Sequence, residues 1–194
     1  MLRRLLMWIV ALAILVPAPL EFCAAGQNVV VVLDDSGSMK EQMRTPRGEV
    51  RRIDAAKQAL KKVLSSLPAD TQVGVLALNT QVAGSNWVVP LGPANPERWR
   101  GKIDAIRAAG GTPLGQYIRN AADELLKLRA AEKYGIYRML VVTDGEANDG
   151  QLLDAILPDV LSRGLVMDVI GVDMQAQHSL ATRAHEAELH RATT

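Results

Sequence analysis

Three short segments carry oxygen-bearing side chains whose types and spacing suit a site for a hard metal ion. Residues 34–38 read Asp-Asp-Ser-Gly-Ser, so a carboxylate and two hydroxyls stand at alternate positions, and Gly37 permits a tight turn. A threonine hydroxyl follows in the segment Gly-Gly-Thr-Pro-Leu at residues 110–114, and a second carboxylate in Thr-Asp-Gly at residues 143–145. Oxygen ligands of this kind favour Mg²⁺ or Mn²⁺ over zinc. The candidate metal ligands are Asp34, Ser36, Ser38, Thr112 and Asp144.

Alternating strands and helices would bring these segments together. A nearly unbroken apolar run at residues 28–33 predicts a strand buried on both faces. Further strands are expected at residues 73–78, 87–91, 137–143 and 166–172. Apolar residues spaced by three and four predict helices at residues 53–67, around 99–106, at 114–131 and at 152–163, the last split by Pro158.

This alternation predicts an α/β fold with a doubly wound, mostly parallel central sheet and helices on both faces. In such sheets ligands bind beyond the carboxyl ends of the strands. Asp34 and Asp144 directly follow two predicted strands, so they are expected at the same edge of the sheet.

Together, these motifs resemble the metal-ion-dependent adhesion site of the von Willebrand factor type A domain family. That site combines Asp-x-Ser-x-Ser, a distant threonine and an aspartate after a later strand, and all five positions occur here in order. The resemblance covers residues 27–175 and implies a Rossmann-like fold with one Mg²⁺ at the top of the sheet. It implies binding by the two serines and the threonine, with the aspartates acting directly or through water. An Asp or Glu of a protein partner would complete the coordination, because neutral hydroxyls leave much of the ion's charge unneutralised.

Composition excludes several classes of function. The 194 residues are 48% hydrophobic and 22% charged, which fits neither a disordered chain nor a multi-span membrane protein. A net charge of +1 argues against a nucleic-acid binder, and one cysteine excludes an internal disulfide framework. The sequence has no P-loop, no Gly-x-Ser-x-Gly elbow and no His-Glu-x-x-His motif, so we do not expect an enzyme.

The N-terminal residues 1–25 have the pattern of a signal peptide. Arg3 and Arg4 precede an apolar run at residues 5–16, which is too short to span a bilayer as a helix. We expect cleavage after Ala25, which leaves residues 26–194 as the domain, with its last strand and helix uncertain after residue 175. The alternative is that these residues stay uncleaved and anchor the protein, which is the only membrane association that we expect. Export to a bacterial periplasm or the exterior is predicted.

Two further features lie near the candidate ligands. The segment 40–52 is basic, and its residues Arg44, Arg47 and Arg51 are candidate contacts for an acidic partner, although an exposed loop kept soluble by its charge is an equal alternative. Asp35 is expected to be a solvated rim residue or a local turn cap rather than a metal ligand, and Asp149 a solvated loop acid rather than a second metal ligand.

The expected function is therefore a metal-dependent protein-interaction or adhesion module of an exported bacterial protein. The alternative is a subunit of a larger enzyme or ATPase-linked assembly, as resembling domains are. The predicted signal peptide disfavours this alternative, because such ATPase partners are cytoplasmic.

Overall fold

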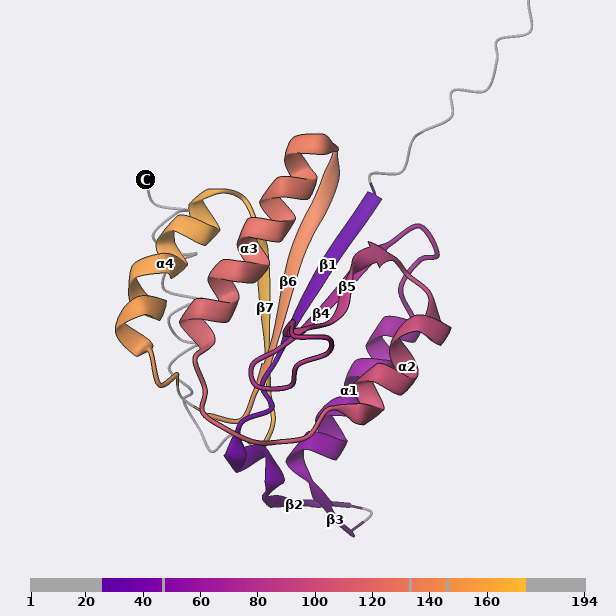
Figure 1. Ribbon diagram of the computed structural model, residues 1–194, viewed down its shortest axis with the longest axis vertical. Coiled ribbons are helices and arrows are strands. Elements are labelled where there is room, and N and C mark those ends of the chain that lie inside the picture. The colour runs from indigo at the N-terminus through magenta and orange to yellow at the C-terminus, as the bar shows by residue number, and fades with distance from the viewer. Residues whose placement is uncertain (1–25, 47, 133, 146, 174–194) are drawn as a thin grey trace, which may run out of the picture.

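The computed structural model describes residues 26–173 apart from residues 47, 133 and 146 (Figure 1). The predicted signal peptide, the predicted contact Arg47 and the segment after residue 173 therefore lie outside the described residues. In the described part of the chain, no helix is both long enough and apolar enough to cross a membrane.

A five-stranded sheet forms the centre of the domain, in the order β5-β4-β1-β6-β7. Four strands run parallel, and β5 alone pairs antiparallel, against β4 at one edge. The strands are β1 (Gly26–Leu33), β4 (Gln72–Ala77), β5 (Trp87–Pro93), β6 (Gly135–Thr143) and β7 (Val166–Gly171). The prediction of a mostly parallel sheet is confirmed.

Two pairs of helices cover the two faces of this sheet (Figure 1). On one face lie α1 (Arg52–Ser65) and α2 (Pro96–Ala105), and on the other lie α3 (Leu114–Ala131) and α4 (Gly150–Ser162). The central strand β1 shows why its sequence is an unbroken apolar run. Its odd-numbered residues from Val29 pack with α1 and α2, and its even-numbered residues from Val30 pack with α3 and α4.

The strand β5, at one edge of the sheet, contains two prolines. Pro90 and Pro93 are both exposed, and the pairing with β4 is irregular between Val73 and Leu76. A proline has no amide hydrogen to donate, so it is tolerated at a sheet edge and not in a central strand.

One predicted break in a helix is wrong. The chain stays helical through Pro158, because this residue lies on the exposed side of α4. The buried side of α4 packs against the core through Leu153, Ile156, Leu157, Val160 and Leu161. This packing outweighs the poor helix propensity of one proline.

The helix expected around residues 99–106 begins at Pro96 and ends at Ala105. The Asn95 side chain accepts a hydrogen bond from the Glu97 amide at 2.9 Å, which caps its first turn. Its end comes before Gly110 because Ile106 adopts an extended backbone, with φ −58° and ψ 136°. Residues 106–113 therefore form a loop that leads to α3.

The basic segment is more ordered than the exposed loop that the sequence suggested. After the short helix η1 (Gly37–Lys40), the strands β2 (Gln42–Thr45) and β3 (Gly48–Arg51) form an antiparallel hairpin. Arg44 stands opposite Glu49 in the register of this hairpin. The pairing of opposite charges supports the hairpin modestly, since both side chains are exposed.

Candidate functional site

The predicted metal ligands lie beyond the carboxyl ends of two adjacent parallel strands. β1 pairs with β6 up to Leu33 and Val142, and the Asp34 amide donates to the Val142 carbonyl at 2.8 Å. The chain therefore leaves both strands at the same edge, as predicted. We call the five residues Asp34, Ser36, Ser38, Thr112 and Asp144 the metal edge.

Asp34 is fully buried at this edge. One carboxylate oxygen accepts from the Ser36 amide at 2.8 Å, and the other accepts from the Thr143 hydroxyl at 2.6 Å. Burial raises the pKa of Asp34 above its usual value of 3.8, and the charge of Asp144 raises it further, against the lowering by hydrogen bonds with Thr143 and Ser36. An ionised Asp34 is thus costly to the fold, and a nearby cation would relieve that cost.

A chain of hydrogen bonds joins Ser36, Ser38 and Asp144 of the metal edge. The hydroxyl oxygens of Ser36 and Ser38 lie 3.0 Å apart, and the Ser38 hydroxyl donates to Asp144 at 2.9 Å. The Asp144 side chain is only 1% exposed. The structure therefore brings together Asp34, Ser36, Ser38 and Asp144, which are four of the five predicted ligands.

Thr112 lies on the neighbouring loop and is 8% exposed. The Gly37 amide donates to the Gly110 carbonyl of this loop at 3.0 Å, and the Asn148 amide donates to the Thr112 carbonyl at 2.9 Å. The Thr112 amide in turn donates to the Asn148 side chain. Backbone contacts thus fix this loop between the segments that carry the other four residues.

Close approach requires glycine in this loop. Gly110 has a φ of +72°, and a Cβ atom there would collide with the Asn79 side chain. At Gly111 a Cβ atom would come within 2.7 Å of the Asn148 side chain. Gly110 is therefore needed for the packing of the metal edge, whereas a side chain at Gly111 would require Asn148 to shift.

Asp35 is buried, which corrects the expectation of a solvated rim residue. Its carboxylate accepts from the Asn79 amide and from the Thr80 amide, each at 2.7 Å. It therefore caps the loop that follows β4, and it acts across the fold rather than within its own turn. Neighbouring residues of an extended chain point apart, which explains why Asp35 faces this loop while Asp34 faces β6.

Asp149 is half-buried and has a structural partner, so the expectation of a solvated acid is also wrong. Its two oxygens accept from the amides of Gly115 and Gln116, both at 2.9 Å. These amides belong to the first turn of α3, where the unpaired N–H groups favour a negative charge. Asp149 thereby holds the loop after Asp144 against the helix that follows Thr112.

Sequence reasoning missed Arg52, which supplies the positive charge at the metal edge. Its guanidinium lies 3.1 Å from Asp144, 2.9 Å from Glu41 and 2.9 Å from Asp173. Burial lowers the pKa of Arg52, but its hydrogen bonds to Asp173 and Asp144 raise it on balance, so it stays charged. Its place in a run of basic residues was visible, but the run did not reveal which member turns inward.

The donor set fits a hard divalent cation. The metal edge contains oxygen donors only, two carboxylates and three hydroxyls, and Asp34 is buried at a cost that a cation would reduce. No group of three or more His, Cys, Asp or Glu side chains that could hold a metal ion occurs within residues 26–173 as described. A bound ion would thus rely on hydroxyls as well as carboxylates.

Two of the three predicted partner contacts, Arg44 and Arg51, lie on the hairpin that follows η1. The Arg44 side chain is 93% exposed on β2, with Glu49 at 3.9 Å. The Arg51 side chain ends β3, is 61% exposed and lies 2.8 Å from Asp54. Both remain accessible to a partner.

Two crystal structures share this fold at 16% identity. One is manganese-loaded TRAP protein of Plasmodium vivax, with a TM-score of 0.57 over 84% of this chain and 62% of that one. The other is the pilus adhesin SpaC of Lactobacillus rhamnosus GG, with a TM-score of 0.64 over 85% of this chain and 27% of that one. The chain therefore spans less than two thirds of either protein.

Sequence comparisons give the family. The chain is 26% identical over 160 residues to the uncharacterized protein YwmC of Bacillus subtilis (strain 168), over 77% of this chain and 67% of that protein. The family model of the von Willebrand factor type A domain matches residues 29–146, which include all of the metal edge. The chain belongs to the von Willebrand factor type A domain family.

Proposed function

We propose that this domain is a metal-dependent interaction module that binds a carboxylate of a protein partner at the metal edge. The family supports a role in protein interaction, and the relatives of the same fold include an adhesin. The observation that carries the proposal is the hydrogen-bonded set of Asp34, Ser36, Ser38 and Asp144 beyond two adjacent parallel strands.

The residues proposed to hold Mg²⁺ or Mn²⁺ are those of the metal edge. A neighbour of the same fold is a manganese-loaded protein, which supports a divalent ion at this edge. The bound ion would supply a positive charge on which an Asp or Glu of the partner can dock. Three of the five donors are neutral hydroxyls, so the chain itself neutralises only part of such a charge.

The surrounding residues hold these donors in place. Asp35 fixes the loop after β4, Asp149 fixes the start of α3, and Arg52 balances the charge of Asp144. Arg44 and Arg51, with Arg47 of the same segment, are proposed to steer an acidic partner toward the edge.

We further propose that the domain binds without chemical turnover and acts outside the cytoplasm of a bacterium, in the periplasm or at the exterior. The signal-peptide pattern of residues 1–25 supports export.

Calorimetric titration of the purified protein with Mg²⁺ and with Mn²⁺ tests the metal. We expect one saturable site that Asp34→Ala removes and Thr112→Ala weakens. Asp70→Ala, which removes an exposed acid beyond α1, is the matched control and should bind as the unmodified protein does. Absence of saturable binding of either ion to the unmodified protein would refute the proposed metal site.

The partner is sought by affinity capture from the exported fraction, with Mg²⁺ or with EDTA. A partner retained in Mg²⁺, released by EDTA and lost with Thr112→Ala supports the carboxylate bridge. Charge reversal at Arg44 and Arg51 should slow association and reduce its salt dependence, with little change in dissociation. Capture of the same partner with equal strength in EDTA would contradict the bridge.

A further inference from the structure

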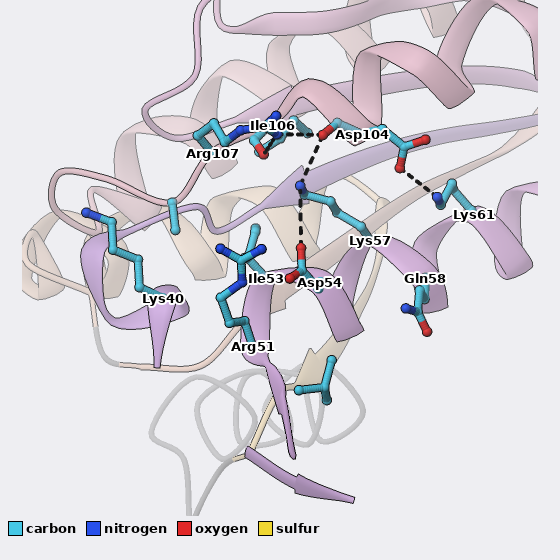
Figure 2. A pocket seen from close by; sticks show the side chains of 12 residues that line it. Lys40, Arg51, Ile53, Asp54, Lys57, Gln58, Lys61, Asp104, Ile106 and Arg107 are labelled. Carbon is cyan, nitrogen blue, oxygen red and sulfur yellow. Dashed lines mark hydrogen bonds and ion pairs between the residues drawn. The ribbon is translucent and has the colours of Figure 1, made fainter. Parts of the chain in front are cut away.

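A cleft of about 730 Å³ runs along α1 (Figure 2). Its walls are the end of η1, the end of β3, one side of α1, the end of α2 and the loop after α2. We call it the basic cleft, because its charged lining consists of two carboxylates, Asp54 and Asp104, and five cations: Lys40, Arg51, Lys57, Lys61 and Arg107.

The two carboxylates neutralise only part of this charge. Asp54 lies 2.8 Å from Arg51 and 3.8 Å from Lys57, and the Asp104 carboxylate lies 2.6 Å from Lys61. Three positive charges are thus left over in one cleft, in a protein whose net charge is only +1.

Two of the cations bind neutral backbone oxygens. The Lys57 amine donates to the Asp104 carbonyl at 3.2 Å, and the Arg107 guanidinium donates to the carbonyls of Asp104 and Ile106 at 2.7 and 3.0 Å. The Lys57 side chain is 8% exposed, and its burial lowers its pKa, against the opposing charge of Asp54, which raises it. A carbonyl orients a cation without cancelling its charge, so these side chains remain attractive to an anion.

We propose that the basic cleft binds an acidic stretch of an extended polypeptide, several of whose Asp or Glu side chains pair with these cations. The proposal rests on the proposed function in that the partner is a protein, but it does not require the metal.

The layout of the charges favours several separate carboxylates over one compact anion. In Figure 2 the cations follow one another from Lys40 past Arg51 and Lys57 to Lys61. Arg51 and Lys61 are separated by a helical rise of about 15 Å, the length of four or five extended residues. Asp54, which pairs with both Arg51 and Lys57, already shows that a single carboxylate fits between two of these cations.

The cleft also adjoins the metal edge along the chain. Lys40 comes two residues after Ser38, and Arg51 directly precedes Arg52, which binds Asp144. One acidic partner can therefore engage the ion with one carboxylate and the cleft with those that follow. Apolar lining residues, among them Ile53 and Ile106, offer contact to the stems of its side chains.

The test uses a fluorescent peptide of six glutamates and the full-length protein in EDTA, so that no metal takes part. Fluorescence anisotropy should show saturable binding, and a peptide of six glutamines should not bind. The double variant Lys40→Glu/Arg107→Glu should weaken binding at least tenfold. Lys62→Glu/Lys102→Glu changes the net charge equally at exposed positions outside the cleft, and should leave binding within twofold.

Three results would overturn the proposal: no binding to the unmodified protein, equal weakening by both double variants, or full displacement of the peptide by a few millimolar inorganic phosphate at constant ionic strength. The last would identify a site for small phosphate-like anions. As a measurement that needs no variant, amide chemical shifts of the unmodified protein should change along residues 51–61 and 104–108 on peptide addition. Because EDTA is present throughout, failure here leaves the metal titration untouched, and failure of that titration leaves this result standing.

Discussion

The metal edge and the basic cleft adjoin each other along the chain, yet their excess charges have opposite sign. The boundary passes between two neighbouring residues. Arg52 turns inward and is shared by Asp144, Glu41 and Asp173, whereas Arg51 turns to the cleft and meets Asp54. At the metal edge acidic groups are in excess and buried; in the cleft basic groups are in excess and mostly exposed.

A nearly neutral chain thus carries two neighbouring sites whose excess charges have opposite sign. Each site also buries one group whose ionisation is penalised: burial raises the pKa of Asp34 and lowers the pKa of Lys57. A cation would relieve the first and a carboxylate the second. The two sites therefore call for complementary ligands.

Of the changes that test this difference, removal of Arg52 should reduce the stability of the fold most. In EDTA, Arg52→Gln should lower the free energy of unfolding by about 3–5 kcal/mol, because Asp144 is left buried without its counter-charge. Urea denaturation measures this loss, and added Mg²⁺ should restore part of it if the ion binds beside Asp144.

Arg51→Gln is the matched control. Its pair with Asp54 is exposed, so the loss should stay below about 1 kcal/mol. Equal losses for the two arginine variants would mean that the two regions do not differ in the way described.

A smaller effect is expected from the loop that carries Thr112. Gly110→Ala should cost about 2 kcal/mol, because alanine disfavours the left-handed backbone and its Cβ displaces Asn79. It should also weaken Mg²⁺ binding in calorimetry, since the loop must shift. Gly101→Ala in α2, where a Cβ atom meets nothing within 4 Å, should be neutral or stabilising by up to about 1 kcal/mol. A Gly110→Ala protein that is as stable as this control would show that the metal edge tolerates rearrangement.

The smallest expected effect is in the pH dependence. The pKa of Asp34 is higher in the folded state than in the unfolded state, so without metal its ionisation destabilises the fold at neutral pH. Acidification through the raised pKa relieves this cost, and protons then compete with the ion. The increase in Tm caused by saturating Mg²⁺ should therefore be full at neutral pH and shrink before the pH reaches 3.8.

Thermal unfolding at a series of pH values, with Mg²⁺ or with EDTA, gives this increase. Asp34→Asn should show none of it at any pH. An increase that persists unchanged down to pH 3.8 would contradict the assignment of Asp34 as a ligand.

The sequence predicted most of the architecture because hydrophobic period is a local property. The apolar run of β1 and the spacing in α3 each reveal which faces are buried, and α3 has the predicted bounds, Leu114–Ala131. Pro158 failed as a signal because the side of α4 on which it lies is decided by packing against the core. Short, charged strands such as β2 and β3 carry no such period.

The candidate site was predictable where residues follow a motif, and not where their roles depend on distant partners. Asp34 and Asp144 were placed correctly because strand ends share an edge. Asp35 accepts from amides of the loop after β4, Asp149 accepts from amides of the first turn of α3, and Arg52 pairs with Asp144 and Asp173. These partners lie dozens of residues away, and no local spacing marks them.

The two prolines of β5 have a consequence for how copies of this domain can behave when crowded. A sheet edge normally offers a row of amide hydrogens to another chain, and that row is where aggregation by strand pairing begins. Pro90 and Pro93 interrupt the row on this side of the sheet. Domains gathered densely around a shared partner are thereby protected from fusing, edge to edge, into a continuous sheet through β5.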